Sequence, residues 1–306
     1  MLSIIIPAYN EEEVLEEFYR RISDSLINID LPYELIFVND GSRDRTLSLL
    51  TNLTQQDERV VVIDLSRNFG KEIAVSAGID FARGEAVVII DADLQDPPEV
   101  IPELIEQWRN GYDNVYARRS SRDGESIIKK ITSYLFYRVI GGMTHIDIPA
   151  DTGDFRLLSR RAVDALKQLP ERNRFMKGLY SWIGFPSIAV NYRRDPRYAG
   201  TTKWNYWKLW NFALEGITSF TEVPLKLASY VGGLIAFAAF CYGMYIIVNT
   251  LYFGNDVPGY PSLIVTILFL GGIQLIFIGI LGEYLGRAFA EVKQRPLYFI
   301  NKVIKK

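Results

Sequence analysis

Two long apolar runs lie near the C-terminal end of the chain. No Asp, Glu, Lys or Arg occurs from Leu227 to Asn255, or from Val257 to Gly282. A helix needs about 20 apolar residues to cross the hydrocarbon core of a bilayer. Buried helices of soluble proteins seldom lack charge over such lengths. We therefore expect two transmembrane helices, at about 226–252 and 262–285, that form a hairpin.

The first 117 residues alternate between strand and helix patterns. Apolar runs predict strands at Leu2–Ala8, Leu35–Val38, Val60–Leu65, Ala86–Ile90 and Val115–Ala117. Helical spacing predicts helices at Glu12–Asn28, Asp44–Thr54 and Lys71–Ala82. This alternation favours an α/β fold with a mostly parallel sheet, in which ligands bind beyond the carboxyl ends of the strands.

Residues 126–225 are less regular and contain two amphipathic segments. Ile127–Met143 mixes basic with apolar residues, and Trp204–Phe220 carries three tryptophans with nearby lysines. Tryptophan and tyrosine favour the membrane interface, and basic residues favour anionic head groups. We expect interfacial helices here; the alternative is that both segments pack on the sheet.

The charges that flank the apolar runs indicate an orientation. The segment after the second run is basic, with Lys293, Arg295, Lys302, Lys305 and Lys306. The loop between the runs, 253–261, has Asp256 and no Lys or Arg. The N-terminus enters a strand without the basic region of a signal peptide. The positive-inside rule then predicts that the large part of the chain before the hairpin and the C-terminus are cytoplasmic.

The composition of the chain disfavours several kinds of functional site. A formal net charge of −2 argues against general nucleic-acid binding. The single cysteine, Cys241, rules out an intrachain disulfide, and the single histidine, His145, rules out a multi-histidine zinc site. A metal would have to bind carboxylates and carbonyls, so Mg²⁺ or Mn²⁺ is the natural candidate.

The segment Asp91–Asp96 carries the strongest chemical signal. It directly follows the strand that ends at Ile90, and Asp91 and Asp93 are one residue apart. Such a pair can bind one cation, with a nucleotide diphosphate supplying further oxygen ligands. The alternative is a solvated acidic turn.

Three further polar segments follow strands. They are Pro7–Glu11, Asn39–Ser42 and Arg67–Lys71. Asp40 could accept a hydrogen bond from a base ring N–H of the kind uracil offers, although Asp40-Gly41 is also an ordinary turn pair. The segment Arg67–Lys71 opens a helix, so it could contact phosphate or ribose.

Together these segments resemble inverting family-2 glycosyltransferases with the GT-A fold, within the dolichol-phosphate mannose synthase-like group. Asp154–Leu157, Arg197–Gly200 and Thr202–Trp204 match the same group. The end of the chain, with Gly259–Ser262 and Gly282–Arg287, looks most like bacterial bactoprenol glucosyltransferases. The resemblance covers nearly the full chain.

The resemblance implies roles for individual residues. The nucleotide-sugar would be held by Pro7, Tyr9, Asn10, Glu11, Asp40, Asn68, Gly70, Lys71, Asp91 and Ala92. The metal ligands would be Asp91, Asp93 and Gln95. The diphosphate or acceptor phosphate would be gripped by Arg118, Arg122, Arg197 and Lys203, each of which could instead be a solvated surface charge. Catalysis would involve Asp93, Asp154, Arg197 and Lys203.

Asp154 is the usual candidate for a catalytic base in this family. The acceptor argues against that role, because phosphate monoesters have a second pKa of about 6 and are largely dianions at neutral pH. A dianion attacks without losing a proton, so cations should matter more than a base. Asp154 would then orient Arg156, Arg197 or a sugar hydroxyl.

We therefore divide the chain into four parts. They are a nucleotide-sugar-binding GT-A core at 1–125, an acceptor-side region with interfacial helices at 126–225, the transmembrane hairpin at 226–288 and a basic cytoplasmic tail at 289–306. Small residues in the hairpin, such as Gly232-Gly233 and Gly271-Gly272, permit close helix packing. They favour a homo-oligomer, with a tetramer among the options.

The expected reaction transfers glucose from UDP-glucose to polyprenyl (undecaprenyl) phosphate, with inversion, at the cytoplasmic membrane. GDP-mannose or a modified UDP-pentose is the alternative donor. A processive polysaccharide synthase is disfavoured by the small number of membrane helices and by the lack of a Gln-x-x-Arg-Trp motif. A non-catalytic membrane scaffold is disfavoured by the intact Asp91, Asp93 and Gln95 set.

Overall fold

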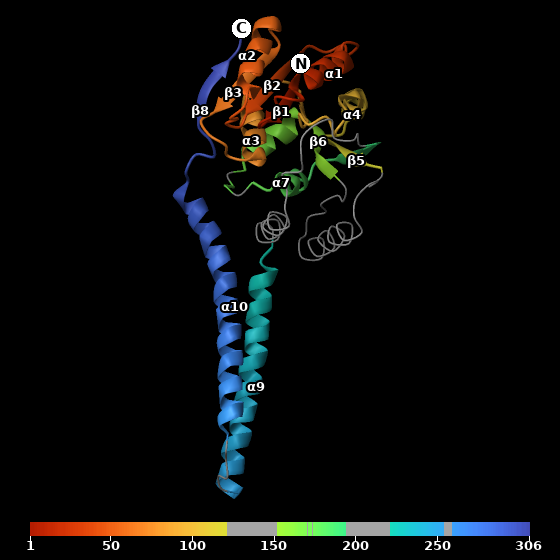
Figure 1. Cartoon of the computed structure of the whole chain (residues 1–306). Coiled ribbons are helices and arrows are strands. Elements are labelled where there is room, and N and C mark those ends of the chain that lie inside the picture. Colours follow the sequence, from red (N-terminus) through yellow and green to blue (C-terminus); the bar gives the residue numbers. More distant parts are fainter. Residues whose placement is uncertain (121–151, 170, 173, 194–220, 254–258) are drawn as a thin grey trace. The chain divides into compact units, whose positions relative to one another are not determined.

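The computed structural model describes residues 1–120, 152–169, 171–172, 174–193, 221–253 and 259–306 (Figure 1). The chain divides into two compact units. One contains Met1–Ala213 together with Arg295–Lys306, and the other contains Leu214–Gln294. The predicted amphipathic segments, Ile127–Met143 and Trp204–Phe220, lie outside the described residues.

The first unit is built on a sheet whose described strands run in the order β7-β5-β6-β4-β1-β2-β3-β8. The strands are β1 (Leu2–Ala8), β2 (Tyr33–Asn39), β3 (Val60–Leu65), β4 (Ala86–Ile89), β5 (Asn114–Arg119), β6 (Thr152–Ser159), β7 (Ser187–Tyr192) and β8 (Ile300–Ile304). Strand β1 is parallel to β2 and β4, β2 to β3, and β5 to β7. Strands β6 and β8 run antiparallel to their neighbours. The predicted mostly parallel α/β fold is confirmed.

Helices lie against this sheet (Figure 1). They are α1 (Leu15–Leu26), α2 (Thr46–Gln56), α3 (Lys71–Phe81), the short 3₁₀ helix η1 (Pro98–Val100), α4 (Ile101–Arg109), α6 (Arg160–Lys167) and α7 (Met176–Trp182). Helix α1 buries Phe18 and Ile22, which are spaced to lie on one face and join the core beside Ile4 and Ile6 of β1. Ile5 points to the other face of the sheet, where Gly78 of α3 lies close to it.

All five strands predicted from apolar runs occur, with ends shifted by at most two residues. The sequence reading missed β6, β7 and β8. Strand β6 lies between β4 and β5, so the expected boundary at 125 separates strands that pair in one sheet.

The end of the chain differs from the expected tail at 289–306. Helix α10 (Tyr260–Lys293) continues past the expected end of the hairpin, and Ile300–Ile304 forms β8, antiparallel to β3. Ile304 packs against the hydrophobic core, which gives this short basic segment an apolar anchor. The segment after the hairpin is therefore part of the sheet of the first unit.

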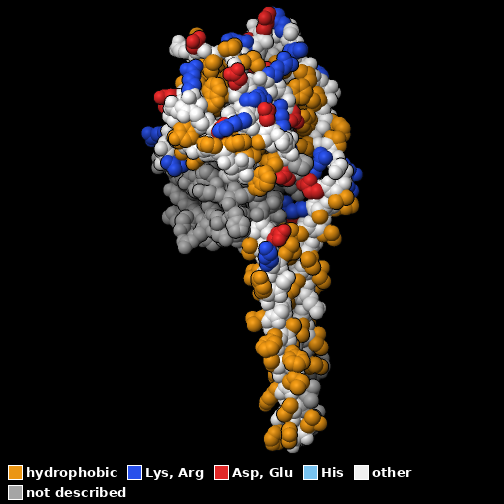
Figure 2. Space-filling model, turned by 180° about the vertical axis from the view of Figure 1, so that it is seen from behind, with side chains coloured by type: hydrophobic (Ala, Val, Ile, Leu, Met, Phe, Trp, Pro, Cys, Tyr) orange, Lys and Arg blue, Asp and Glu red, His pale blue; other side chains and the backbone are white. Residues whose placement is uncertain are grey.

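The second unit contains two long apolar helices, α9 (Val223–Phe253) and α10. The candidate spans, Val223–Phe253 and Leu263–Lys293, have mean hydropathies of 2.1 and 2.6 and are not buried within the protein. Hydrophobic side chains cover most of the length of these helices, with a few charged side chains at one end, whereas most Lys, Arg, Asp and Glu side chains in this view are on the other unit (Figure 2). Both helices are long enough to cross a bilayer.

Candidate functional site

The site is assembled at one edge of the sheet. Strands β1, β2, β3 and β4 are parallel, so the loops that follow them meet at this edge. Strand β6 is antiparallel to β4 and places its beginning there, because Arg156 pairs with Ile89. Asp154 and Asp91 therefore come from strand ends that are neighbours in space.

Lys71 joins these two carboxylates. Its Nζ lies 2.6 Å from an oxygen of Asp91 and 2.6 Å from an oxygen of Asp154. Lys71 is the first residue of α3, directly after Gly70, whose φ of 99° favours glycine. Three residues that the sequence analysis singled out separately are thus brought into one ion-pair cluster.

The charges in this cluster shift the ionisation of its members. Burial alone would raise the pKa of Asp154, but the positive charges of Lys71 and Lys177 outweigh it and hold that pKa well below its usual range. Burial raises the pKa of Asp91, and the charges of Asp154 and Asp96 add to this effect, while Lys71 opposes it. Asp154 is therefore a weak base.

Arg156, two residues after Asp154, forms a buried pair with Tyr180. Of this pair, only Arg156 was named from the sequence. The guanidinium of Arg156 lies 3.8 Å from the centre of the Tyr180 ring and donates a hydrogen bond to the Gly153 carbonyl at 3.0 Å. Asp154 Oδ1, Arg156 Nε and the Tyr180 hydroxyl are buried and have no hydrogen-bond partner among the residues that the structure describes. Tyr180 and Lys177 lie on α7, and no motif in the sequence marked them.

Asp40 binds the backbone of the loop that precedes α3. Its side chain is buried, and its two carboxylate oxygens accept hydrogen bonds from the backbone N–H groups of Phe69 (2.7 Å) and Gly70 (3.0 Å). A Cβ on Gly41 would come within 2.4 Å of the Arg67 backbone, so only glycine allows this close approach. Asp40 thus orders this loop, and its contact with a base stays a prediction.

The loops after β1 and β2 are joined by hydrogen bonds. The backbone N–H of Asn10 donates to Ser42 Oγ at 3.0 Å, and Asn10 Oδ1 accepts from the Arg43 backbone at 2.9 Å. Glu11 N–H donates to Thr46 Oγ1 at 2.9 Å. Asn10 has a φ of 53°, a conformation that asparagine tolerates better than most residues. These bonds hold the predicted nucleotide segment 9–11 against the second loop.

The remaining residues of the predicted nucleotide set vary in exposure. Pro7 is the β1 residue that pairs with Val38, and it is partly buried. Asn68 is exposed, whereas Ala92 is buried.

The segment Asp91–Asp96 alternates between exposed and buried positions. Asp91, Asp93 and Gln95 are partly exposed, whereas the residues between and after them are buried. Asp93 Oδ1 accepts a hydrogen bond from the Gln95 backbone at 3.1 Å, and Leu94 has a left-handed φ of 58°. This turn leaves the three predicted metal ligands partly exposed.

The metal ligand set has hard oxygen donors, which fit Mg²⁺ or Mn²⁺. No group of three His, Cys, Asp or Glu residues in the described ranges converges on a metal position. The predicted set has only two carboxylates and one amide, so a bound metal would need further oxygen ligands from its substrate or from water.

The predicted phosphate-binding residues are only partly described. Arg118 is exposed, and its Nε donates to Asn191 Oδ1 at 2.9 Å. The next residue, Arg119, lies with Nη2 4.0 Å from an oxygen of the buried Asp96. Arg119, which is not among the predicted phosphate-binding residues, therefore lies near the acidic segment. Arg122, Arg197 and Lys203 lie outside the described residues.

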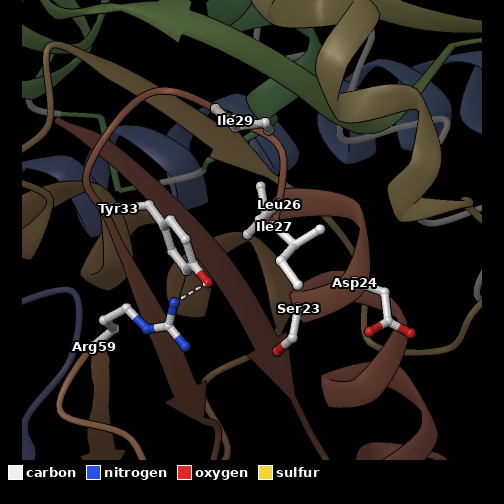
Figure 3. A pocket seen from close by; sticks show the side chains of 7 residues that line it. All are labelled: Ser23, Asp24, Leu26, Ile27, Ile29, Tyr33 and Arg59. Atoms are coloured by element: carbon white, nitrogen blue, oxygen red, sulfur yellow. Dashed lines mark hydrogen bonds between the residues drawn. The ribbon is translucent and has the colours of Figure 1, made fainter.

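A cavity of about 350 Å³ lies elsewhere (Figure 3). It is lined by Ser23, Asp24, Leu26, Ile27, Ile29, Tyr33 and Arg59, and Arg59 donates a hydrogen bond to the Tyr33 hydroxyl. Tyr33 begins β2 and Arg59 precedes β3, so the cavity is at the amino ends of these strands. It is not part of the site at their carboxyl ends.

Comparison with known proteins places the chain in a family. The glycosyl transferase family 2 profile matches residues 3–167, and the profile of the GtrB C-terminal hairpin matches residues 223–288. The chain therefore belongs to glycosyl transferase family 2 and is a glycosyltransferase, as the sequence resemblance implied. Its two apolar helices form a membrane-associated hairpin.

Close relatives match over almost their whole length. An uncharacterised glycosyltransferase of Synechocystis is 56% identical over 98% of this chain and 94% of that protein. The bactoprenol glucosyl transferase of Shigella phage SfII is 50% identical over 98% of this chain and 97% of that protein. A prophage bactoprenol glucosyl transferase homologue of Escherichia coli is 49% identical over 99% of both chains.

Solved structures are more distant. Glucosyl-3-phosphoglycerate synthase from Mycobacterium tuberculosis, in complex with Mn²⁺, UDP-glucose and phosphoglyceric acid, is 21% identical, with a TM-score of 0.47. The match covers 71% of this chain and 77% of that one. A likeness at this level says nothing about the ligands of this chain.

Proposed function

We propose that this protein transfers glucose from UDP-glucose to polyprenyl phosphate at the cytoplasmic face of a membrane. The observation that carries the proposal is the full-length similarity, at about half identity, to bactoprenol glucosyl transferases. That similarity includes both the catalytic unit and the apolar hairpin. A lipid acceptor explains why a glycosyltransferase would carry a membrane hairpin, since its phosphate stays near the bilayer surface.

The reaction needs no base. A phosphate oxygen of the acceptor attacks the anomeric carbon, and the bond from that carbon to the UDP oxygen breaks, so UDP leaves with the electron pair. The acceptor is largely a dianion at neutral pH and has no proton to lose. The low pKa of Asp154 agrees with this, because a carboxylate stabilised by Lys71 is a poor proton acceptor.

The chain's charged residues must bring two anions together. Asp91, Asp93 and Gln95 would hold Mg²⁺ or Mn²⁺, which would offset the negative charge of the leaving diphosphate. Lys71 adds a cation between Asp91 and Asp154. We assign Asp154 the task of holding Lys71 in place, and not that of a base.

The donor is tested by a panel assay. Purified protein is incubated with polyprenyl phosphate and labelled UDP-glucose, GDP-mannose or a UDP-pentose, and lipid-linked sugar is extracted and counted. We expect UDP-glucose to give the fastest transfer, with inversion to a β-linked product. Transfer only from GDP-mannose or a UDP-pentose would replace the donor and keep the reaction, whereas no transfer from any donor would contradict the proposal.

The proposed contact with the acceptor phosphate is tested by replacing two cationic residues. Arg197 and Lys203 precede an aromatic segment suited to the head-group layer. Replacing either by alanine should lower transfer by about 30- to 1000-fold, in line with the loss of one charged partner of a transition state. UDP-glucose affinity should change much less. Loss of donor affinity in step with transfer would assign these residues to the diphosphate instead.

Subunit assembly stays a proposal. Gly233, Gly271 and Gly272 have open space where a side chain would stand, so a second copy of the hairpin could approach closely there. We propose a homo-oligomer, which light scattering of the detergent-solubilised protein would test.

A further inference from the structure

The C-terminal strand β8, at the edge of the sheet, begins with a bulge. Strand β3 pairs with β8 in a register that joins Asp64 to Lys302 and Leu65 to Ile300. Asn301 is the extra residue between these pairs. A bulge of this kind re-aims a side chain, and such bulges often occur beside active sites.

The bulge points Asn301 at a buried carboxylate. Asn301 Nδ2 donates to Asp64 Oδ2 at 2.7 Å, and Asn39 Nδ2 donates to Asp64 Oδ1 at 2.7 Å. Asp64 is 3% exposed and Asn39 is 1% exposed. Each oxygen of the buried Asp64 therefore has one amide donor, and one of the two donors comes from the segment after the membrane hairpin.

Asn39 continues the connection to the proposed donor loops, residues 9–13 and 40–46. Asn39 Oδ1 accepts the backbone N–H of Ser42 at 3.3 Å. Ser42 Oγ in turn accepts the backbone N–H of Asn10 at 3.0 Å. One path of hydrogen bonds thus leads from Asn301 through Asp64 and Asn39 into both donor loops.

We propose that Asn301 and Asp64 are positioning residues for the nucleotide-sugar, acting through Asn39. The inference rests on the proposed function only for the identity of the donor. Asp64 fixes which way the Asn39 amide points, and that orientation presents Oδ1 to the Ser42 loop. The strand that follows the membrane hairpin therefore completes the donor loops, and a chain that ended at the hairpin would leave Asp64 half satisfied.

The first variant is Asn301→Ala, which leaves one oxygen of a buried carboxylate without its donor. We expect the KM for UDP-glucose to rise by about three- to ten-fold, the loss typical of one partly buried hydrogen bond. The KM for polyprenyl phosphate and kcat should change by less than about two-fold, because the path ends in the donor loops.

A rescue pair tests the path itself. Asn301→Asp alone places a second carboxylate against Asp64 and should weaken donor binding more than alanine does. Combining it with Asp64→Asn restores both bonds, since the new amide at 64 can accept from Asn39 and donate to the carboxylate at 301. Donor affinity should return to within about two-fold of that of the unmodified protein, and failure to recover would contradict the path.

Tyr298→Phe is the matched control. Tyr298 lies on the same C-terminal segment, and its hydroxyl donates to Asp80 Oδ2 at 2.8 Å, on α3 and away from the donor loops. Its loss should lower the Tm about as much as Asn301→Ala does while leaving donor affinity unchanged. An equal loss of donor affinity in both variants would reduce Asn301 to a residue that only supports the fold.

A final measurement does not depend on the donor's identity. Amide hydrogen exchange in peptides covering 39–46 should be faster in Asn301→Ala than in Tyr298→Phe, because the Ser42 loop loses its hold. Unchanged exchange there would overturn the inference. If the exchange result holds but the unmodified protein binds no UDP-glucose, the positioning role stands and the proposed donor is wrong.

Discussion

At the scale of single residues, the site is organised around Lys71. Its ammonium lies between Asp91 and Asp154, and the residue itself opens a helix that follows a glycine-dependent loop. Carboxylates this close repel each other unless a cation separates them. Lys71 therefore favours the ionised form of both Asp154 and Asp91, which is itself a proposed metal ligand.

The prediction about the metal concerns a substitution of Asp93. Asp93→Asn keeps the size of the side chain, and its amide oxygen can still accept from the Gln95 backbone. It removes one negative charge from the proposed ligand set, so transfer that depends on Mg²⁺ or Mn²⁺ should be abolished in a folded protein. Full activity in the variant, or wild-type activity after complete chelation, would show that no metal acts through Asp93.

Asp154 carries the prediction about the base. Asp154→Asn should slow transfer because it loosens Lys71, yet the dependence of kcat on pH between about 6 and 9 should keep its shape. The reason is that the pKa of Asp154 lies far below this range and the acceptor needs no deprotonation. A variant that recovers its rate only at high pH would restore the base to the mechanism.

The pKa of Glu72, the residue after Lys71, lets us predict how the stability of the protein changes with pH. Burial and the charge of Asp154 raise the pKa of Glu72 to about 8, against the pull of Lys71 and Lys177. At pH values between the ordinary pKa of glutamate and about 8, Glu72 is protonated in the folded protein but ionised in the unfolded chain. The free energy of unfolding therefore falls as the pH rises through this window.

Glu72→Gln, which stays neutral, should remove that fall. We expect its Tm to match that of the wild type near pH 5 and to exceed it by at least about 2–4 °C at pH 8, equivalent to about 1 kcal/mol. Scans across this range, at one heating rate, give the comparison. Parallel curves for the two proteins would mean that Glu72 titrates normally.

The residues of the site were predictable to different degrees. Asp91, Asp93 and Gln95 follow a strand in a pattern that sequence alone exposes. Lys71 was noted from its place at the start of a helix, whereas Asp154 was found only through the family resemblance, because the contact between the two depends on an antiparallel strand far along the chain. Lys177 and Tyr180 lie on a short helix without a motif, so nothing local marked them.

At the scale of elements, α3 packs so closely against β1 that position 78 has no room for a side chain. A Cβ at Gly78 would lie 2.3 Å from Cγ2 of Ile5, in a buried part of the sheet. Gly78→Ala should therefore destabilise the protein by about 1–3 kcal/mol, as overpacked cores do, despite the better helix propensity of alanine. The effect should appear as a lower Tm.

The partner variant supplies the control. Ile5→Ala removes the atom that the new methyl group would meet, at its own cost of about 2–5 kcal/mol. The double variant should be more stable than the sum of the two single losses allows, by more than about 0.5 kcal/mol. Additive losses would show that α3 shifts away from β1 instead of clashing with it.

The elements that sequence predicted best are the continuous apolar strands. Leu2–Ala8 and Val60–Leu65 are buried over nearly all positions, so their composition marks them without reference to a partner. Strand β8 was missed because Ile300–Ile304 contains two polar residues and becomes a strand only by pairing with β3. Strand β6 was missed because charged residues interrupt it, and both of these, Asp154 and Arg156, are buried in the site.

At the scale of the whole molecule, the order of the segments constrains the membrane topology. The catalytic unit is made from residues on both sides of the hairpin, since Arg295–Lys306 returns to the unit that Met1–Ala213 begins. Both outer ends of the hairpin must then be on the same side of the membrane as the catalytic sheet. This requires an even number of crossings, which agrees with the two spans α9 and α10.

The last prediction fixes which side that is. The basic residues after α10 and the acidic residue in the loop between the helices predict that the catalytic unit is cytoplasmic. In intact cells, a cysteine-reactive probe that cannot cross the membrane should label a cysteine placed at Asp256 and should not label one placed after Lys306, with Cys241 replaced by serine in both proteins. After the cells are opened, both positions should react. Labelling of both from outside would mean that the hairpin does not cross the membrane, because the pairing of β8 with β3 keeps the C-terminus on the same side as the sheet. Labelling of the C-terminal position alone would reverse the orientation and move the donor site away from the cytoplasmic supply of nucleotide-sugars, so it would contradict the proposed reaction as well as the topology.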